Sequence, residues 1–161
     1  MIYFMKYVRL TKEQFENLHE EFALFLATQS IDKTQWNSIK IENPKLTDKL
    51  LDVFSDMVWD QSLEKINYLE NKSDHHLFLF KCQVAQIDLI LIRLEDDCPS
   101  LMDKNYKNWL AEHLSDPKVS IFESSKITNK GLKTEKFNLI NEGAVVSDGK
   151  TFEDLKSFLS K

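Results

Sequence analysis

Glycine is scarce and unevenly placed in this chain of 161 residues. It has three glycines, where average usage would give roughly eleven, and they stand at Gly131, Gly143 and Gly149. Glycine supplies tight turns with positive φ and loops that cradle phosphate, so residues 1–130 contain no glycine-dependent turn or ligand loop. Neither G-x-G-x-x-G nor G-x-x-x-x-G-K-[ST] occurs. Any site in this stretch must therefore be built from side chains on helix and strand faces.

The charge of the chain argues against a nucleic-acid-binding surface. The formal net charge is −5, and the 21 basic residues include only two arginines, Arg9 and Arg93. Nucleic-acid-binding proteins usually present a basic face to the phosphates and use arginine for bidentate contacts. We therefore expect no nucleic-acid partner.

Length, cysteine usage and hydropathy predict one cytoplasmic domain. Cys82 and Cys98 form no C-x-x-C motif, so we expect free thiols in a reducing compartment. No apolar run reaches the ~18–20 residues of a membrane span, so we expect no membrane partner. The short apolar start lacks the basic region and the cleavage site of a signal peptide. Met5 is an alternative natural start to Met1, which would make residues 1–4 an upstream extension.

Helical spacing and capping residues predict three helices in the first part of the chain. Thr11 and Gln14 have the spacing of a capping box ahead of a first helix. Asp32 is expected to open a second helix, which ends before Pro44 because proline disfavours helix at the preceding residue. Thr47 is expected to cap a third helix that ends near residue 61 or 62.

Short apolar runs predict a sheet in the second part of the chain. The runs at 77–82 and 87–94 predict an antiparallel hairpin. Residues 89–92 have no polar alternation, which predicts a strand covered on both faces. Residues 66–70 are interpreted as a short strand or as a continuation of the third helix. Further strands are expected at 119–124 and 144–147, and further helices from Pro99, Thr134 and Thr151.

This order of elements predicts an α+β fold. Its N-terminal helical half, with three helices, is expected to pack on a small mixed β-sheet with C-terminal helices. We expect a single domain over residues 1–161, with a possible helical subdomain over 11–62 and a sheet-containing part over 66–161.

A row of acids marks the third predicted helix. Asp48, Asp52, Asp56 and Asp60 follow one another at four-residue steps, and the helical wheel places Trp59 among them. Like charges at this spacing destabilise a helix by about 0.2–0.5 kcal/mol per pair, so helix stability does not explain the row. One hypothesis is that these five residues bind a basic protein partner. The alternatives are a solvated face with Trp59 covered by another element of the chain, or self-association that buries Trp59.

Signatures of catalysis are weak in this chain. Glu16, His19 and Glu20 have the spacing of one half of a carboxylate-bridged metal site, but no second Glu-x-x-His occurs. Asp88 follows an isoleucine as in the metal-binding strand of restriction-type nucleases, but the Glu-x-Lys strand that should come next is missing. The lysine-rich stretch 118–136 is expected to be a solvated loop. We therefore predict no catalytic residue, no metal and no cofactor.

Several blocks of the sequence resemble a family of small proteins of unknown function from flavobacteria and related Bacteroidetes. They are residues 5–41, VFSDMVWD at 53–60, YLE at 68–70, HLFLFKC at 76–82 and EGAVVSDG at 142–149. The resemblance spans most of the chain and implies a compact cytoplasmic bacterial protein whose start is Met5. It carries over no catalytic residue.

The leading functional hypothesis is a non-catalytic cytoplasmic protein-binding or regulatory module that uses the acidic and aromatic helix face. The alternative is a small metal-dependent hydrolase or nuclease-like enzyme.

Overall fold

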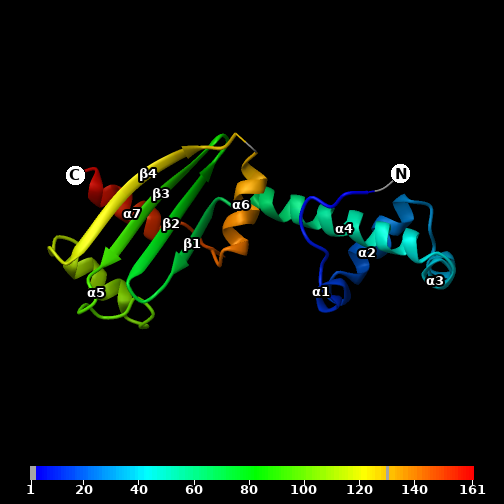
Figure 1. The fold of residues 1–161 in the computed structure, drawn as a ribbon, viewed down its shortest axis with the longest axis horizontal. Coiled ribbons are helices and arrows are strands. Elements are labelled where there is room, and N and C mark those ends of the chain that lie inside the picture. Colours follow the sequence, from blue (N-terminus) through cyan, green and yellow to red (C-terminus); the bar gives the residue numbers. More distant parts are fainter. Residues whose placement is uncertain (1–2, 130) are drawn as a thin grey trace. The chain divides into compact units, whose positions relative to one another are not determined.

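A computed structural model describes residues 3–129 and 131–161, so Met1, Ile2 and Lys130 lie outside the described residues. It confirms the α+β class, with N-terminal helices ahead of a five-stranded sheet (Figure 1). The elements are α1 (Lys12–Asn17), α2 (His19–Thr28), α3 (Lys33–Glu42), α4 (Pro44–Lys65), β1 (Tyr68–Lys72), β2 (His76–Gln83), β3 (Gln86–Leu94), α5 (Tyr106–His113), β4 (Val119–Ile127), α6 (Leu132–Asn141), β5 (Val145–Val146) and α7 (Lys150–Leu159).

The chain forms two units, Met1–Ser62 and Leu63–Lys161, which we call unit 1 and unit 2. The boundary falls inside α4, whose last three residues belong to unit 2. None of the helices among the described residues has the length and apolar character needed to cross a membrane.

The first two predicted helix starts of unit 1 are confirmed. Thr11 and Gln14 form the capping box, because the Gln14 amide donates to the Thr11 hydroxyl (3.2 Å) and the Thr11 amide donates to the Gln14 side chain (2.8 Å). Asp32 and Gln35 form a second capping box ahead of α3, with both hydrogen bonds at 2.8 Å. The first helix is interrupted at Leu18, where ψ is 24°, and therefore divides into α1 and α2.

The predicted start of the third helix at Thr47 is wrong, because α4 begins at Pro44. Proline suits the first helical position, where its missing N–H would have no partner in the helix. The Asn43 side chain accepts a hydrogen bond from the Leu46 amide (3.2 Å), so Asn43 acts as the cap. The Thr47 hydroxyl instead donates to the carbonyl of Ile39 (3.2 Å) at the end of α3.

The predicted end of that helix near residue 61 or 62 is also wrong. α4 continues to Lys65 because Leu63 is fully buried and belongs to the apolar side of its last turn. The strand β1 then follows at Tyr68–Lys72, so the short strand was the correct interpretation of residues 66–70.

Aromatic rings from the four helices α1 to α4 form the core of unit 1. Phe54 of α4 is 3% exposed, and its ring centroid lies 5.0 Å from that of Phe22 and 5.5 Å from that of Phe25. Trp36 of α3 meets Phe22 edge to face at 5.3 Å. Pairs of this kind contribute about 0.5–1.5 kcal/mol each beyond the burial of their area. The apolar faces predicted for α2 and α4 therefore pack against each other in this core.

The five strands of unit 2 form one sheet in the order β4-β3-β2-β1-β5. Each of the four strand pairings is antiparallel. The expectation of a mixed sheet is therefore wrong. The hairpin of β2 and β3 is confirmed, with Val84 and Ala85 as its two-residue turn. An antiparallel meander needs only such short connections, which explains how β1 to β3 form without glycine.

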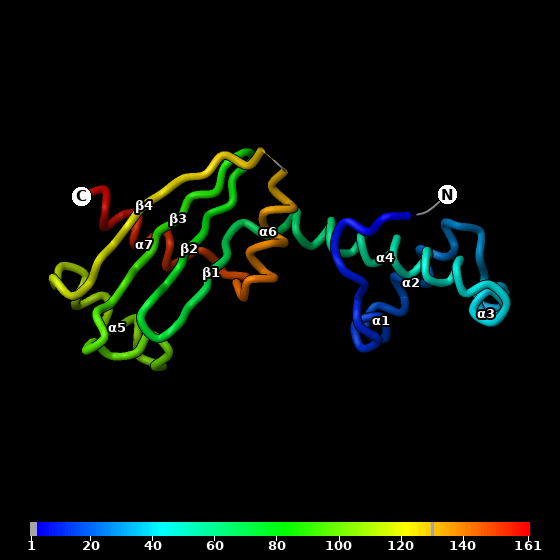
Figure 2. Tube along the Cα trace, in the orientation of Figure 1, coloured from blue at the N-terminus to red at the C-terminus, as the bar shows by residue number. Residues whose placement is uncertain are grey.

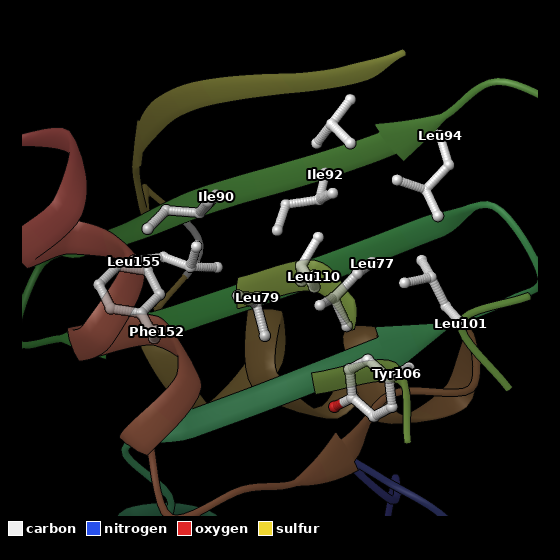
Figure 3. Close-up of a cluster of buried hydrophobic side chains, with 11 residues drawn as sticks. Leu77, Leu79, Ile90, Ile92, Leu94, Leu101, Tyr106, Leu110, Phe152 and Leu155 are labelled. Carbon is white, nitrogen blue, oxygen red and sulfur yellow. The ribbon is translucent and has the colours of Figure 1, made fainter. Parts of the chain in front are cut away.

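Two helices, α5 and α7, cover one face of this sheet (Figure 1). Their side chains pack on alternate residues of β2 and β3, as Figure 3 shows. The strands contribute Leu77, Leu79, Ile90 and Ile92, all at most 2% exposed, and the helices contribute Tyr106, Leu110, Phe152 and Leu155. α5 begins at Tyr106, later than the expected start at Pro99.

The predicted caps of the last two helices, Thr134 and Thr151, are also wrong, because a glycine stands at the cap position of each helix. α6 begins after Gly131 and α7 after Gly149, rather than at Thr134 and Thr151. Before α7, the carboxylate of Asp148 accepts a hydrogen bond from the Lys150 amide (3.0 Å).

The lysine-rich stretch 118–136 is not a loop, because most of it belongs to β4 and α6. Lys136 is 3% exposed, and its Nζ donates to the carbonyl of Leu63 (2.9 Å) in the last turn of α4. Burial lowers the pKa of Lys136. The lysine therefore caps a helix end within unit 2.

Replacement of Gly149 by alanine should destabilise the protein more than replacement of Gly143. Both glycines have positive φ, 83° and 110° respectively, which costs another residue about 1–3 kcal/mol. A Cβ at Gly149 would also meet the ring of Tyr68 at less than van der Waals distance, whereas the nearest atom at Gly143 is 3.6 Å away. In urea unfolding, the midpoint concentration should be highest for wild type, lower for Gly143→Ala and lowest for Gly149→Ala. Equal midpoints for the two variants would contradict this packing.

Candidate functional site

The acidic row of α4 is contacted by the chain's own N-terminal segment, residues 3–10. This segment runs beside α4 within unit 1 (Figure 2). Each of the four aspartates expected to bind a partner accepts at least one hydrogen bond from it. The sequence did not suggest this arrangement, because residues 3–10 contain no helix or strand pattern that would place them.

Asp56 is the most constrained member of the row, at 3% exposure. Its Oδ2 accepts hydrogen bonds from the Tyr3 hydroxyl (2.6 Å) and the Lys6 amide (2.9 Å), and its Oδ1 accepts one from the Tyr7 amide (3.1 Å). A buried carboxylate is costly unless it is hydrogen-bonded, and hydrogen bonds to a charged acceptor are the strong ones. Asp56 therefore fixes the segment through its backbone as well as its side chains.

The other aspartates bind Tyr7 and Arg9 of the segment at more exposed positions. Asp60 accepts a hydrogen bond from the Tyr7 hydroxyl (2.6 Å). Arg9 donates from Nε to Asp52 (2.6 Å) and from Nη1 to Asp48 (3.4 Å). The hydrogen bond to Asp52 raises the pKa of Arg9. Cations and hydroxyls from the same chain thus offset the repulsion among the four carboxylates.

Both tyrosines of the segment are held in the neutral form. Burial and the hydrogen bond to Asp56 raise the pKa of Tyr3 to about 12. Burial and the hydrogen bond to Asp60 likewise raise the pKa of Tyr7. A phenolate beside these carboxylates would be repelled by their negative charge. The two tyrosines therefore bind the carboxylates through protonated hydroxyl groups, which donate the hydrogen bonds.

Trp59 is half-buried, and its ring packs against the aromatic core of unit 1. Its centroid lies 6.3 Å from that of Tyr7, with the ring planes tilted by 38°. The cover over Trp59 therefore includes another element of the same chain, as the second interpretation of the row expected. Use of Asp48, Asp52, Asp56, Trp59 and Asp60 by a partner stays a prediction.

The weak metal candidates of α1 and α2 are exposed side chains. Glu16, His19 and Glu20 all lie at the surface, and His19 Nδ1 is 3.0 Å from the main-chain oxygen of Glu16. Throughout residues 3–129 and 131–161, no three His, Cys, Asp or Glu side chains are grouped so that they could hold a metal ion. A metal-dependent hydrolase thus remains an alternative based on the sequence alone.

Asp88, the other candidate for metal chemistry, takes part in a local hydrogen-bond network on the helix-covered face. Gln86 (2.5 Å) and Ser125 (2.7 Å) donate to its Oδ1. Burial raises its pKa, but these hydrogen bonds outweigh burial and hold the pKa below the usual value. The carboxylate lines a cavity of about 470 Å³ that also contains Glu123 and Lys156, which form an ion pair at 2.9 Å.

The second candidate surface is the sheet face opposite α5 and α7, which the sequence interpretation missed. Figure 1 shows no helix over β2, β3 and β4 on this side. Phe78, Leu91 and Phe122 lie side by side in register across these three strands. Phe122 is 47% exposed, and the other two are only half-buried. We call this surface the open face; it consists of His76, Phe78, Leu89, Leu91, Arg93 and Phe122.

Helix α6 covers the neighbouring part of the same sheet face. Its Leu132, Leu139 and Ile140 pack around a smaller core of Leu69, Cys82, Ile87 and Ala144. The cover ends near Phe80, whose ring stacks at 6.4 Å on that of Phe78. The open face is therefore the continuation of a buried apolar surface beyond the end of α6.

The open face also differs from the rest of the chain in charge. Among the described strand residues on this side none is acidic, whereas Glu70, Asp88 and Glu123 lie on the helix-covered side. Arg93 is exposed, and its guanidinium carbon lies 5.5 Å from the centroid of the Phe122 ring. The face thus combines aromatic rings with a cation, in a chain whose net charge is negative.

The expectation that residues 89–92 are covered on both faces is wrong. Ile90 and Ile92 are buried under the helices, but Leu89 and Leu91 are only half-buried on the open face. A run without polar alternation predicts apolar residues on both faces and does not identify what covers them. The signal available in the sequence was that β2 also carries apolar residues at every position from Leu77 to Phe80.

Comparison with known proteins gives a family and no activity. A family model described as a family of unknown function (DUF6495) matches residues 5–160. No curated protein and no solved structure matches the chain.

Replacement of Asp56 by asparagine should release the N-terminal segment. The neutral asparagine side chain loses the charge-assisted hydrogen bonds, and its NH₂ group faces donors of the segment. The free energy of unfolding should therefore fall by on the order of 2–3 kcal/mol. Hydrogen exchange should show faster exchange at the Lys6 and Tyr7 amides, which donate to Asp56. Asp48→Asn is the matched control, because Asp48 is 62% exposed and its loss should cost less than about 1 kcal/mol. Unchanged exchange in Asp56→Asn would contradict the anchoring role.

Alkaline pH should weaken the same contact. Tyr3 has a folded pKa of about 12 against about 10 when unfolded, so its contribution is complete below pH 10 and is lost as pH rises through 12. Tyr3→Phe lacks the titrating hydroxyl. The difference in unfolding free energy between wild type and Tyr3→Phe should therefore shrink between pH 9 and pH 12. A difference that is constant or grows over this range would be inconsistent with the hydrogen bond.

Proposed function

Since the chain belongs to DUF6495, a family of unknown function, we propose a function from its geometry: a non-catalytic binding module that holds another protein on the open face of its sheet. The observation that supports this most strongly is the row Phe78, Leu91 and Phe122, which crosses three strands without a covering helix in unit 2. Contiguous exposed apolar surface of this kind is typical of interaction sites.

The composition of the open face favours a protein over a nucleic acid as its partner. The cores of protein interfaces are enriched in aromatic residues and arginine and depleted in Lys, Asp and Glu. The open face has two phenylalanines, a histidine and Arg93, and none of the depleted types. A nucleic acid needs several cations for its phosphates, and the nearest lysine on this side, Lys126, is 3.3 Å from the carboxylate of Glu135.

The charges define the chemistry of the partner. An apolar segment can cover the three-residue row, and a carboxylate at its border can meet the exposed guanidinium of Arg93. The absence of acidic strand residues on this side, among those the structure describes, means that such a carboxylate meets no like charge on the strands. We therefore propose an apolar partner surface with an acidic border.

The acidic row of α4 is the second candidate surface. Its contacts with Tyr3, Lys6 and Arg9 indicate which chemistry it accepts: phenol hydroxyls, main-chain amides and cations. A basic, tyrosine-containing segment of a partner would have to displace residues 3–10 to use Asp48, Asp52, Asp56, Trp59 and Asp60. The open face needs no such displacement within its unit, so we rank it first.

A cytoplasmic location fits this proposal. Cys82 and Cys98 are unpaired, as expected of a protein in a reducing compartment.

Reversal of one charge on the open face should weaken partner binding. Arg93→Glu replaces an exposed cation and should repel the acidic border, reducing affinity at least tenfold, or about 1.4 kcal/mol. Lys107→Glu is the matched control, because Lys107 is an exposed cation of α5 on the covered side. Partners retained from an extract of the source organism by wild type should be identified and purified, and their affinity for each variant measured by calorimetry.

The variants separate the open face from the rest of the surface. Wild type and Lys107→Glu should bind equally, whereas Arg93→Glu and Phe78→Ala should bind weakly with their circular dichroism unchanged. A partner that binds all four proteins equally, or the absence of any partner of wild type, would refute the proposal. If an Asp52→Lys variant alone loses the partner, the acidic row is the binding surface.

A further inference from the structure

Strand β4 forms an unprotected edge of the sheet. It stands at the end of the strand order and pairs with β3 alone among the described strands. The pairing runs without interruption from Gln86↔Ile127 to Leu94↔Val119, so β4 has nine residues and no bulge. It also contains no proline. Natural proteins usually shorten, bend or block such edges, because an exposed edge is a template for another strand.

The hydrogen bonds to β3 identify which backbone groups of β4 point outward. The Thr128 amide donates to the carbonyl of Ala85, and the Glu95 amide donates to that of Lys118, both at 3.1 Å. Hydrogen-bonded pairs alternate along an antiparallel ladder, so the even-numbered residues of β4 pair with β3. The amides and carbonyls of residues 121, 123, 125 and 127 therefore face away from the sheet.

These outward groups allow β4 to pair with β4 of a second copy about a two-fold axis. The position of the axis sets the register, that is, which residues of the two copies lie opposite each other. The possible registers differ in the charges of these opposing side chains. An axis at residue 122 would place Lys126 opposite Lys118 of the other copy. An axis at residue 123 would place the two Glu123 carboxylates opposite each other. Like charges directly opposite are destabilising, so both registers are disfavoured.

An axis at Ser124 gives complementary pairs instead. Ile121 then lies opposite Ile127 of the second copy, and Phe122 lies opposite its Lys126. Ile127 is 70% exposed, so this pairing removes an apolar side chain from water. A lysine opposite an aromatic ring allows a cation–π contact. Glu123 meets Ser125, and the two Ser124 residues meet each other, with no like charges opposed.

We propose that the protein forms a homodimer through antiparallel pairing of β4 with β4 of a second copy, with Ser124 on the two-fold axis. Residues 121–127 of each copy pair, and the two five-stranded sheets become one continuous sheet. The two open faces then lie on the same side of that sheet, because a two-fold axis perpendicular to the sheet keeps its faces distinct. The dimer contact shares Phe122 with the open face but includes neither Phe78 nor Arg93, so substitutions at Arg93 and at Ile127 test the two proposals separately.

A cysteine trap tests the register. In the proposed dimer Ser124 is a non-hydrogen-bonded pair with Cα atoms about 4.5 Å apart, within the range that a disulfide spans. Ser124→Cys in a Cys98→Ser background should therefore form a disulfide-linked dimer under mild oxidation. Ser120→Cys is the matched control on the same strand and the same face. Its two copies would be eight residues out of register, roughly 26 Å apart, and should stay monomeric on a non-reducing gel.

Sedimentation tests the association itself. Wild type should show a dimer whose fraction rises with concentration, and Ile127→Lys should shift it to monomer. Val145→Lys is the control, because Val145 is an exposed valine of β5 at the opposite end of the strand order. Val145→Lys should dimerise like wild type, and so should the open-face variant Arg93→Glu. A wild type that is monomeric at 100 μM, or equal cross-linking of Ser124→Cys and Ser120→Cys, would overturn the proposal.

Discussion

One-sided burial of the sheet is the constraint on which the rest of unit 2 depends. Helices α5 and α7 pack on Leu77, Leu79, Ile90 and Ile92, which are almost completely inaccessible to water. The intervening residues of the same strands, which lie on the opposite face of the sheet, are also largely apolar. Helix α6 covers only the part of this opposite face around Cys82 and Ile87. An antiparallel sheet with one solvated face usually carries polar residues there. Apolar residues in those positions support our proposal that this face is a contact surface.

Unit 1 resolves the opposite problem, an excess of charge, within the chain. Four aspartates on one side of α4 repel one another, and Asp56 is buried as well. The N-terminal segment supplies main-chain amides, two phenol hydroxyls and Arg9, so that each carboxylate has a donor from the same polypeptide. The acids therefore have a structural role, and the uncovered apolar surface of the sheet is the stronger candidate for an external contact.

Local sequence signals predicted the elements well and their surroundings poorly. The capping boxes at Thr11 and Asp32, the hairpin and the α+β class follow from short-range patterns, and the structure has them. Errors arose where a distant residue decided the outcome: Leu63 extended α4 by its burial, and Asn43 displaced Thr47 as the cap. The acidic row was identified as unusual, but its partners lie about 50 residues away in a segment without regular structure. The unbroken apolar runs of β2 and β3 were the available signal for the open face, but such runs show which residues are apolar and not which helix covers them.

We propose that Phe78, Leu91 and Phe122 are accessible in the isolated protein and covered by a partner in its native setting. Hydroxyl-radical footprinting measures this directly, with the fully buried Leu77 as an internal reference. We expect strong oxidation of the three side chains in dilute purified protein and marked protection after addition of an extract of the source organism, with Met102 on an exposed turn labelled equally in both. Equal oxidation of the three side chains with and without extract would contradict it, as would protection already complete in the purified protein.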